Sequence, residues 1–599
     1  MKSRRIWWCL PALLLLPGNA GALDNLTRPV GPIHHWSAAD LERFHEGLVQ
    51  VKFVEGSEVA PAGRAFTDAS GLDLAGVNAA LAANSVTEVR PTFKYDRSTL
   101  RQWKADGEAR SGVTGPDLSL WFDLRVSGGR QQVADLVNAL NDDGSVEIAH
   151  PVPFAEPAEI RTPHSGVAAW APAAPPASSG GDPQRVTPDF SGQQSYLYAP
   201  PVGLNAPAAW ALNGGLGQGM KFIDVELCWT EDHEDFSSSN MFYIGGAAQD
   251  PGYETHGTAV LGEVIGQHNG YGVKGFAPET QWGVVAVTEA EWPTVPHYFQ
   301  EAVDHLSAGD VWLIELQMYP PGKSATPMEW LQVNYDVIWT SSYSLGIVCV
   351  EAGANGSQNL DDPSWGNLFN RLFRDSGATM VAAGTPTGLT AEWFTNYGTR
   401  MDVHAWGSSI VTTGYGDLYN GGTLQTRYTA TFGGTSGASP MVTGSALCLQ
   451  GIARAYLGSP LDPITLRRIL NQTGTPYSGQ QRIGPRPDLA AASDGVLAIL
   501  AAPGAPLALG AAPVASPSPF QGSTTIRFQL SRPDQAAVRI YDPTGRVVRT
   551  LFRGPLGSGA HHLLWDSRDD QGREIGEGVY FYRIDAGDAS GTGRVLKIR

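Results

Sequence analysis

The stretch that decides the fold is Gly433-Gly434-Thr435-Ser436-Gly437-Ala438-Ser439-Pro440, and a run of small and apolar residues, 441–447, follows it directly. This run predicts a buried helix, so Ser436 lies at a helix start. A helix N-terminus carries unpaired backbone N–H groups and the positive end of the helix dipole, which suit a developing oxyanion. Serine is also a common helix cap, so a nucleophile at this position requires a base and an acid elsewhere in the chain.

Two candidate partners precede this serine. Asp224 ends the short apolar run 221–223, which predicts a strand with a carboxylate at its C-terminal tip. His256 opens a helical run, 256–265. The chain order Asp, His, Ser is the order of the catalytic residues in subtilisin and differs from that in chymotrypsin. A serine hydroxyl needs a hydrogen-bonded base to act as a nucleophile, and the base needs an acid to orient it.

Residues 190–500 resemble the subtilisin-like serine peptidases (subtilases) at further points in the correct order, which are 272–278, 351–356, 394–398, 402–407 and 483–489. The resemblance implies an α/β fold with a three-layer, doubly wound parallel sheet over residues 188–502. It implies that His256 takes the proton of Ser436 and that Asp224 orients His256. The amide of Asn355 and the backbone N–H of Ser436 would form the oxyanion hole, and the substrates would be proteins or peptides.

The chain departs from the family pattern after Asp224, where Val225-Glu226 stands in place of a small residue and glycine. Glu226 either raises the pKa of His256 or points into solvent. We expect the solvent-facing orientation, because residues i and i+2 share a face only while a strand continues.

Two further departures affect the substrate cleft. Ala354 stands where relatives have glycine before the oxyanion asparagine. The alignment of this segment with the family pattern is therefore open by one residue. Asn355 is the nearby amide that fits, and Asn359 is the alternative. The segment 314–318 replaces the substrate-binding strand Met-Ser-Leu-Gly of relatives, so substrate preference cannot be carried over.

Two other functions are compatible with parts of this sequence. Sedolisins share the serine motif but have glutamate where subtilisins have histidine, and the intact run 256–258 argues against them. A catalytically inactive subtilase scaffold that binds partners at the cell surface is the second hypothesis. Such proteins normally lack a triad residue, whereas this chain retains a full set, so we expect an active endopeptidase.

The N-terminal region predicts export and self-maturation. Residues 1–22 combine basic residues, an apolar run and small residues before Ala22, as in a secretory signal peptide, so we expect a secreted or cell-surface protein. Residues 23–187 contain a predicted strand, helix and strand at 119–124, 131–140 and 146–150 and are similar to subtilase propeptides. An Ala/Pro-rich linker ends this region, and we expect self-cleavage within 157–190. The propeptide would act as an intramolecular inhibitor; a separate binding domain is the alternative.

The C-terminal segment, 513–599, predicts a small all-β sandwich. Residues 525–530 and 537–541 alternate between apolar and polar side chains, and 578–584 form a further strand. The segment resembles the Ig-like module of flagellar hook-capping proteins and the sorting domains of type IX secretion cargo. The resemblance implies contact with the cell surface or the secretion machinery, and a passive appendage is the alternative.

Composition limits partners and cofactors. The formal net charge of −18 argues against nucleic acid as a partner. Outside the signal peptide the cysteines are Cys228, Cys349 and Cys448, all in apolar runs, so we expect buried free thiols. The chemistry requires no cofactor. Subtilases commonly bind structural calcium, for which 361–362 or 232–235 could supply oxygen ligands, although solvated acidic loops are the favoured interpretation. His233 and His268 are expected at the surface.

Overall fold

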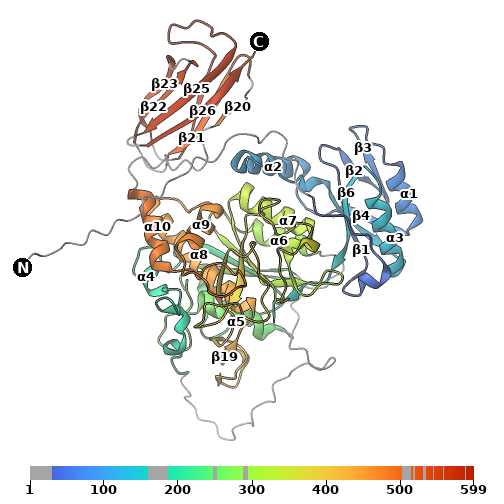
Figure 1. Cartoon of the computed structure of the whole chain (residues 1–599), viewed down its shortest axis with the longest axis vertical. Coiled ribbons are helices and arrows are strands. Elements are labelled where there is room, and N and C mark those ends of the chain that lie inside the picture. The colour runs from blue at the N-terminus through green and yellow to red at the C-terminus, as the bar shows by residue number, and fades with distance from the viewer. Residues whose placement is uncertain are drawn as a thin grey trace, which may run out of the picture.

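The computed structural model describes residues 30–159, 187–246, 252–287 and 294–501, and residues 514–598 with short gaps. Figure 1 shows a central α/β body, an N-terminal body in blue beside it, and a C-terminal β body in red. The predicted signal peptide, 1–22, and most of the predicted linker lie outside the described residues. No helix of the described residues is long and apolar enough to cross a membrane.

The central body is built on a seven-stranded sheet in which every neighbouring pair is parallel. Across the sheet the strands are β16 (Val403–Trp406), β15 (Thr379–Gly384), β14 (Val348–Ala352), β11 (Val311–Ile314), β8 (Lys221–Glu226), β10 (Gln281–Ala286) and β9 (Met241–Gly246). The strands β11, β14, β15 and β16 are buried along their whole length, as expected for a parallel sheet covered on both faces.

The strand order reverses between β8 and β11. From β8 the chain adds β9 and β10 on one side of the sheet, and it then adds β11 and the later strands on the other. In open α/β sheets the crevice at such a switch point, at the carboxyl ends of the strands, is where ligands bind. The carboxyl ends of β8 and β11 are therefore the expected place for a site.

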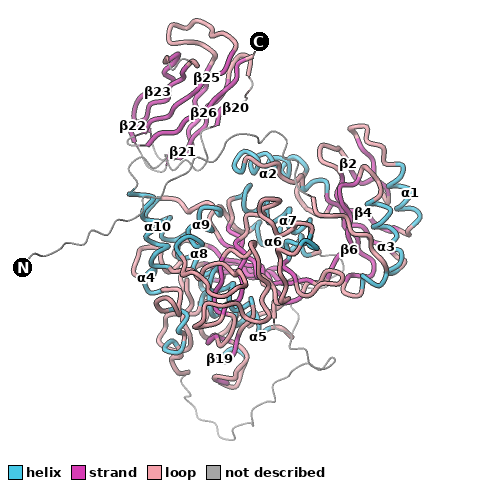
Figure 2. The backbone as a smooth tube through the Cα atoms, viewed as in Figure 1, coloured by secondary structure: helices cyan, strands magenta, loops and turns pink. Residues whose placement is uncertain are grey.

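Helices cover both faces of the sheet, as the magenta strands between cyan helices in Figure 2 show. On one face α5 (Glu254–Ile265) and α8 (Thr435–Leu457) share a core with Phe222 and Leu313. On the other face α6 (Val295–Asp304) and α7 (Gln332–Trp339) share a core with Ile223, Val225 and Ile314. The remaining helices of this body are α4 (Ala206–Trp210), α9 (Pro463–Thr473) and α10 (Leu489–Ala501). The predicted three-layer α/β fold is confirmed.

The N-terminal body has a four-stranded antiparallel sheet with helices. The sheet order is β4 (Val86–Pro91), β5 (Trp121–Val126), β1 (Phe44–Phe53) and β6 (Val146–Pro153), and the helices are α1 (Ala75–Ala83), α2 (Arg97–Ser111) and α3 (Gly129–Asn141). The predicted strand, helix and strand correspond to β5, α3 and β6. The hairpin β2 (Val59–Ala62) and β3 (Ala65–Asp68) completes this body.

Polar contacts join the N-terminal body to the central body. The indole N–H of Trp121 donates to Asp336 Oδ2 at 2.9 Å, and the amide of Gln50 donates to Thr294 Oγ1 at 3.0 Å. Arg110 Nη1 donates to the carbonyl of Ser344 at 2.5 Å. These contacts join the N-terminal body to the start of α6, to α7 and to the helical turn that follows α7.

The C-terminal body consists of two antiparallel sheets. One contains β20 (Val514–Ser516), β21 (Thr524–Leu530) and β24 (Gly559–Trp565); the other contains β22 (Asp534–Tyr541), β23 (Val547–Leu556), β25 (Gly578–Ala586) and β26 (Ala589–Lys597). Alternate residues of β25 are buried, since one face of each sheet packs on a shared core that includes Trp565 and Ile584. The predicted all-β sandwich is confirmed.

Candidate active site

Ser436 lies in the first turn of α8, as the glycine-rich stretch predicts. The residue before the helix, Gly434, has φ 94°, a conformation that favours glycine. Ser436 is fully buried, and its hydroxyl donates to the backbone carbonyl oxygen of Ala158 at 2.5 Å. The serine therefore contacts a peptide carbonyl from the N-terminal part of the same chain.

His256 lies in the first turn of α5, and 2 % of its surface is exposed. Its Nδ1 contacts Glu226 Oε1. Its Nε2 is buried and has no hydrogen-bond partner among the described residues, so this nitrogen is free to accept a proton. The ring packs edge-on against Phe432, with the ring centroids 5.4 Å apart. Burial lowers the pKa of His256, which favours the neutral, basic form.

The acid beside His256 is Glu226, which corrects the predicted pairing with Asp224. The carboxylate oxygen Oδ2 of Asp224 instead accepts from the indole N–H of Trp229 at 2.7 Å. The reason is the length of β8, which continues two residues beyond Asp224 and ends at Glu226. Both side chains point to the α5 side of the sheet, and Glu226 lies nearer the carboxyl end, where His256 enters.

The solvent-facing orientation expected for Glu226 is also wrong, because its side chain is fully buried. Burial raises the pKa of Glu226 well above its usual range. Burial, and then the neighbouring Glu226, raise that of Asp224. Two carboxyl groups in one buried site disfavour double ionisation, so the pair keeps one proton more readily than two separate carboxyl groups would.

Asn355 lies at the position predicted for the oxyanion hole. Its Nδ2 donates to the carbonyl oxygen of Ala158, and its Oδ1 accepts from the backbone N–H of Thr435 at 3.0 Å. The preceding Ala354 has φ 64°, which explains why glycine suits this position. The alternative, Asn359, accepts from the indole N–H of Trp365 through its backbone carbonyl at 2.9 Å, and its side chain accepts from a neighbouring loop amide at 3.0 Å. The geometry therefore favours the register with Asn355.

A segment of the N-terminal region, called here the substrate-like segment, lies against the candidate site. The short strand β7 (Glu156–Pro157) pairs antiparallel with β12 (Leu316–Met318), and β13 (Thr326–Pro327) pairs with the other edge of β12. The N–H of Ala158 donates to the carbonyl of Glu315 at 3.1 Å. The carbonyl of Ala158 thus meets both Ser436 and Asn355, the nucleophile and the oxyanion donor of the predicted site.

Gln317 of β12 joins several of these groups. Its Oε1 accepts from the backbone N–H of Asn355 at 3.1 Å, and its Nε2 lies 3.4 Å from the carbonyl oxygen of Glu159. The side chain is 1 % exposed, and Ala158 is fully buried beside the same strand. A glutamine at this place fills space next to the residue whose carbonyl contacts Ser436.

Sequence reasoning named neither Glu315 nor Gln317 as a site residue, and it assigned Glu226 to solvent. These residues share one signal in the sequence: each follows a buried apolar run closely. Such runs form parallel strands, so residues at their carboxyl ends come together at one edge of the sheet. The strand that receives the substrate-like segment does coincide with the predicted region 314–318.

The remaining side-chain predictions gave mixed results. The three cysteines are buried, as predicted, and none of them forms a disulfide within the part of the chain that the structure describes. His233 is buried, not exposed, since its ring lies against Phe236 and Tyr428 with centroids 5.1 Å away. The described residues contain no cluster of three or more His, Cys, Asp or Glu side chains suited to a metal ion, and structural calcium stays a prediction.

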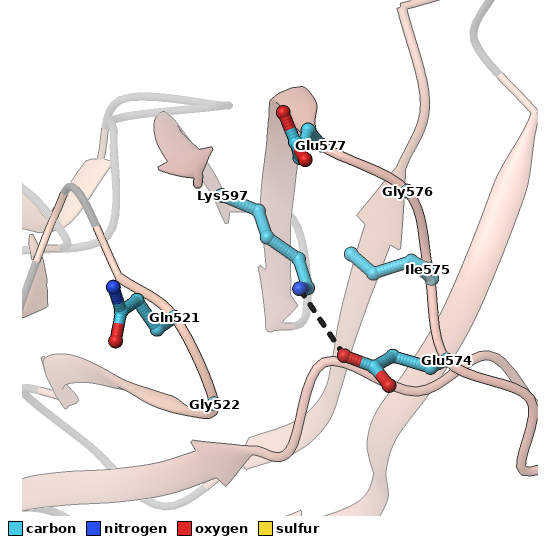
Figure 3. A pocket seen from close by; sticks show the side chains of 7 residues that line it. All are labelled: Gln521, Gly522, Glu574, Ile575, Gly576, Glu577 and Lys597. Atoms are coloured by element: carbon cyan, nitrogen blue, oxygen red, sulfur yellow. Dashed lines mark hydrogen bonds and ion pairs between the residues drawn. The ribbon is translucent and has the colours of Figure 1, made fainter. Parts of the chain in front are cut away.

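A separate pocket of about 500 Å³ lies in the C-terminal body (Figure 3), lined by Gln521, Gly522, Glu574, Ile575, Gly576, Glu577 and Lys597. Lys597 Nζ lies 3.4 Å from Glu574 Oε1 across it. No residue of the central body lines this pocket, so it is not part of the candidate active site.

Comparisons with known proteins match two parts of the chain. A profile of the Subtilase family matches residues 229–486, and one of the FlgD Ig-like domain matches residues 515–590. The Thermophilic serine proteinase of Bacillus sp. (strain AK1) is 26% identical over 296 residues, which are 49% of this chain and 65% of that protein. Subtilisin BL of Lederbergia lenta is 28% identical over 255 residues, 41% of this chain and 81% of that protein. The chain thus spans less than two thirds of the Bacillus protein.

Among solved structures, fervidolysin from Fervidobacterium pennivorans is similar at 14% identity and a TM-score of 0.43, covering 92% of this chain and 72% of that one. The family match begins at Trp229, after both carboxyl groups of β8, so it does not bear on the choice between Asp224 and Glu226. Taken with the parallel sheet and the serine at the start of α8, the profile matches show that this chain carries a subtilase domain and, after it, a FlgD Ig-like domain.

Proposed function

We propose that the protein is a serine endopeptidase that uses Ser436 as nucleophile, His256 as general base and Glu226 as the orienting acid. Ser436 Oγ would attack the substrate carbonyl carbon while His256 Nε2 takes the hydroxyl proton, which it later delivers to the leaving amine. Glu226 would hold the imidazole by its Nδ1 and stabilise the imidazolium.

Asn355 would bind the oxyanion of the tetrahedral intermediate. Its Oδ1 accepts from the N–H of Thr435, which leaves the Nδ2 group directed at the substrate carbonyl. In subtilisin the loss of the equivalent amide lowers kcat by about 10²–10³. The backbone N–H of Ser436, in the first turn of α8, is the second donor.

The observation that carries the proposal is the contact of one carbonyl, that of Ala158, with both Ser436 and Asn355. From it we infer that the chain cuts itself between Ala158 and Glu159. This bond lies within the range 157–190 expected from the sequence. The N-terminal body would remain bound by its surface contacts after cleavage and inhibit the enzyme until it is removed.

A fluorophosphonate probe tests the nucleophile. The purified wild-type protein, after removal of the N-terminal body, should be labelled, and peptide mapping should place the label on Ser436. Ser436→Ala should not be labelled, and His256→Ala should be labelled far more slowly. A wild-type protein that is folded, free of the N-terminal body and unlabelled would favour the inactive binding scaffold.

The place of action follows from the N-terminal sequence. We propose that the signal-like segment 1–22 directs export, and that the protein works outside the cytoplasm with its C-terminal domain in contact with the cell surface. Deletion of 2–22 should retain the protein in the cytoplasm in a bacterial host. Equal amounts outside the cytoplasm with and without this segment would contradict the proposal.

A further inference from the structure

Glu315 lies between the substrate-like segment and the start of α8. It follows β11, and its N–H donates to the carbonyl of Val225 at 3.2 Å, so the chain continues beside β8. Its backbone carbonyl accepts from Ala158, and its carboxyl group is fully buried. The carboxyl oxygen Oε2 lies 2.6 Å from the hydroxyl of Ser439, one helical turn after Ser436.

Both hydrogen bonds of Ser439 can form at the same time when Glu315 carries a proton. Ser439 Oγ also lies 2.7 Å from the backbone carbonyl of Thr435. A hydroxyl has one hydrogen, and a carbonyl oxygen can only accept. If Ser439 donates to Thr435, the hydrogen in the contact with Glu315 must come from Glu315, which is then a neutral carboxylic acid.

The surrounding charges favour the same state. The titratable groups around Glu315 are Asp224 and Glu226 on β8, with His256 and Glu263 on α5. His256 already contacts Glu226, and no ion pair among the described residues includes Glu315. On α8 the groups nearby are the hydroxyls of Ser436 and Ser439.

Ionisation of Glu315 would therefore be costly. Its second oxygen, Oε1, is buried without a hydrogen-bond partner among the described residues, and a charged oxygen in that position loses far more solvation than a neutral one. Burial raises the pKa of Glu315 well above its usual range.

We propose that Glu315 is a positioning residue that acts as a neutral carboxylic acid. Its O–H donates to the hydroxyl of Ser439, and that hydroxyl donates to the carbonyl of Thr435. These hydrogen bonds fix the first turn of α8 and thereby position Ser436 for the substrate. The proposal rests on the proposed role of Ser436 as nucleophile. Loss of the proton at alkaline pH would break this chain of hydrogen bonds and place a negative charge beneath the developing oxyanion. Activity should then fall at alkaline pH.

The protonation state is testable without activity. In a full-length chain with Ser436→Ala, which cannot cleave itself by the proposed mechanism, Glu315 and Glu315→Gln are compared by infrared difference spectroscopy at pH 7. The glutamine variant should lose one C=O band of a protonated carboxyl group and no carboxylate band. Loss of carboxylate bands instead would overturn the proposal.

The positioning role is tested by the pH profile of the active chain. Glu315→Gln keeps a neutral hydrogen-bond donor, so its kcat at pH 7 should lie within about threefold of wild type, and it should lack the alkaline fall of the wild type. Glu315→Ala, checked for folding by its melting temperature, should lose at least tenfold. A glutamine variant that loses 100-fold at pH 7, or that keeps the alkaline fall, would overturn the proposal. If the wild type hydrolyses no peptide, the proposed function fails, and the infrared result alone decides the state of Glu315.

Discussion

Replacing the two carboxyl groups of β8 one at a time separates their roles. Glu226→Gln removes the charge that contacts His256 Nδ1 but leaves a side chain of the same size. Asp224→Asn keeps an oxygen that can accept from the indole of Trp229. We expect Glu226→Gln to abolish most of the activity and Asp224→Asn to leave most of it. The sequence alone predicts the opposite, because it assigns Asp224 as the acid that orients His256.

The magnitude follows from what each group contacts. Glu226 is the carboxyl group in contact with the imidazole, so its loss leaves a buried imidazolium without a counter-charge in the transition state. Removal of the triad aspartate of subtilisin lowers kcat by about 3 × 10⁴. For Glu226→Gln we expect about 10³–10⁴, which corresponds to about 4–5 kcal/mol at 1.36 kcal/mol per factor of ten. Asp224→Asn should change kcat less than about tenfold, because Asp224 contacts the indole of Trp229 and not the imidazole, and an asparagine oxygen can accept from the same indole.

The assay is the chain's own cleavage, followed by mass spectrometry after transfer to pH 7, so that no variant needs prior activation. Melting temperatures of both variants in the Ser436→Ala background establish that each one folds. Slow cleavage by Glu226→Gln with fast cleavage by Asp224→Asn supports the reasoning. Fast cleavage by Glu226→Gln with none by a folded Asp224→Asn would refute it and restore the pairing predicted from sequence.

Three further predictions concern the acid limb of activity, substrate preference and stability. Burial lowers the pKa of His256, and this base must be neutral to accept a proton. The rate of self-cleavage should therefore fall as the pH is lowered, with a midpoint below pH 6.5. A midpoint above pH 7 would contradict this assignment. Gln317→Gly opens space beside Ala158. The ratio of kcat/KM for peptides with leucine before the cleaved bond to kcat/KM for peptides with alanine there should therefore rise about tenfold or more. An unchanged ratio on a peptide library would disprove that Gln317 limits the size of this residue. Arg400 donates to both oxygens of the buried Glu329 at 2.7 and 2.8 Å. Arg400→Met leaves this carboxyl group without its partner, so the free energy of unfolding measured by guanidinium titration should fall by about 3–5 kcal/mol. A loss below about 1 kcal/mol would show that the ion pair contributes little to stability.

The sequence predicts the layers of this fold well, because buried parallel strands are short apolar runs and helix starts carry clear signals. Ser436, His256 and Asn355 each follow such a signal, and the structure brings all three to one end of the sheet. The strand, helix and strand of the N-terminal body and the C-terminal sandwich follow from the same periodicities.

The acid could not be predicted from the sequence in this way, because the end of β8 decides it. The apolar run stops at Ile223, but strand pairing with β10 continues to Glu226. The carboxyl group of Glu226 finds a hydrogen-bond partner at this strand end because the neighbouring helix α5 supplies His256. The resemblance to subtilase propeptides predicts an inhibitory N-terminal region. The exact strand pairing could not be predicted, because β7 and β12 lie about 160 residues apart along the chain.

The measurement that tests the central claim most directly is the intact mass and N-terminal sequence of the protein purified as the full chain and incubated at neutral pH. Wild type should yield a fragment that begins at Glu159, and Ser436→Ala should stay uncut under the same conditions. A fragment beginning at Glu159 from Ser436→Ala as well, or a wild-type chain that is folded and never cut at this bond, would contradict the account.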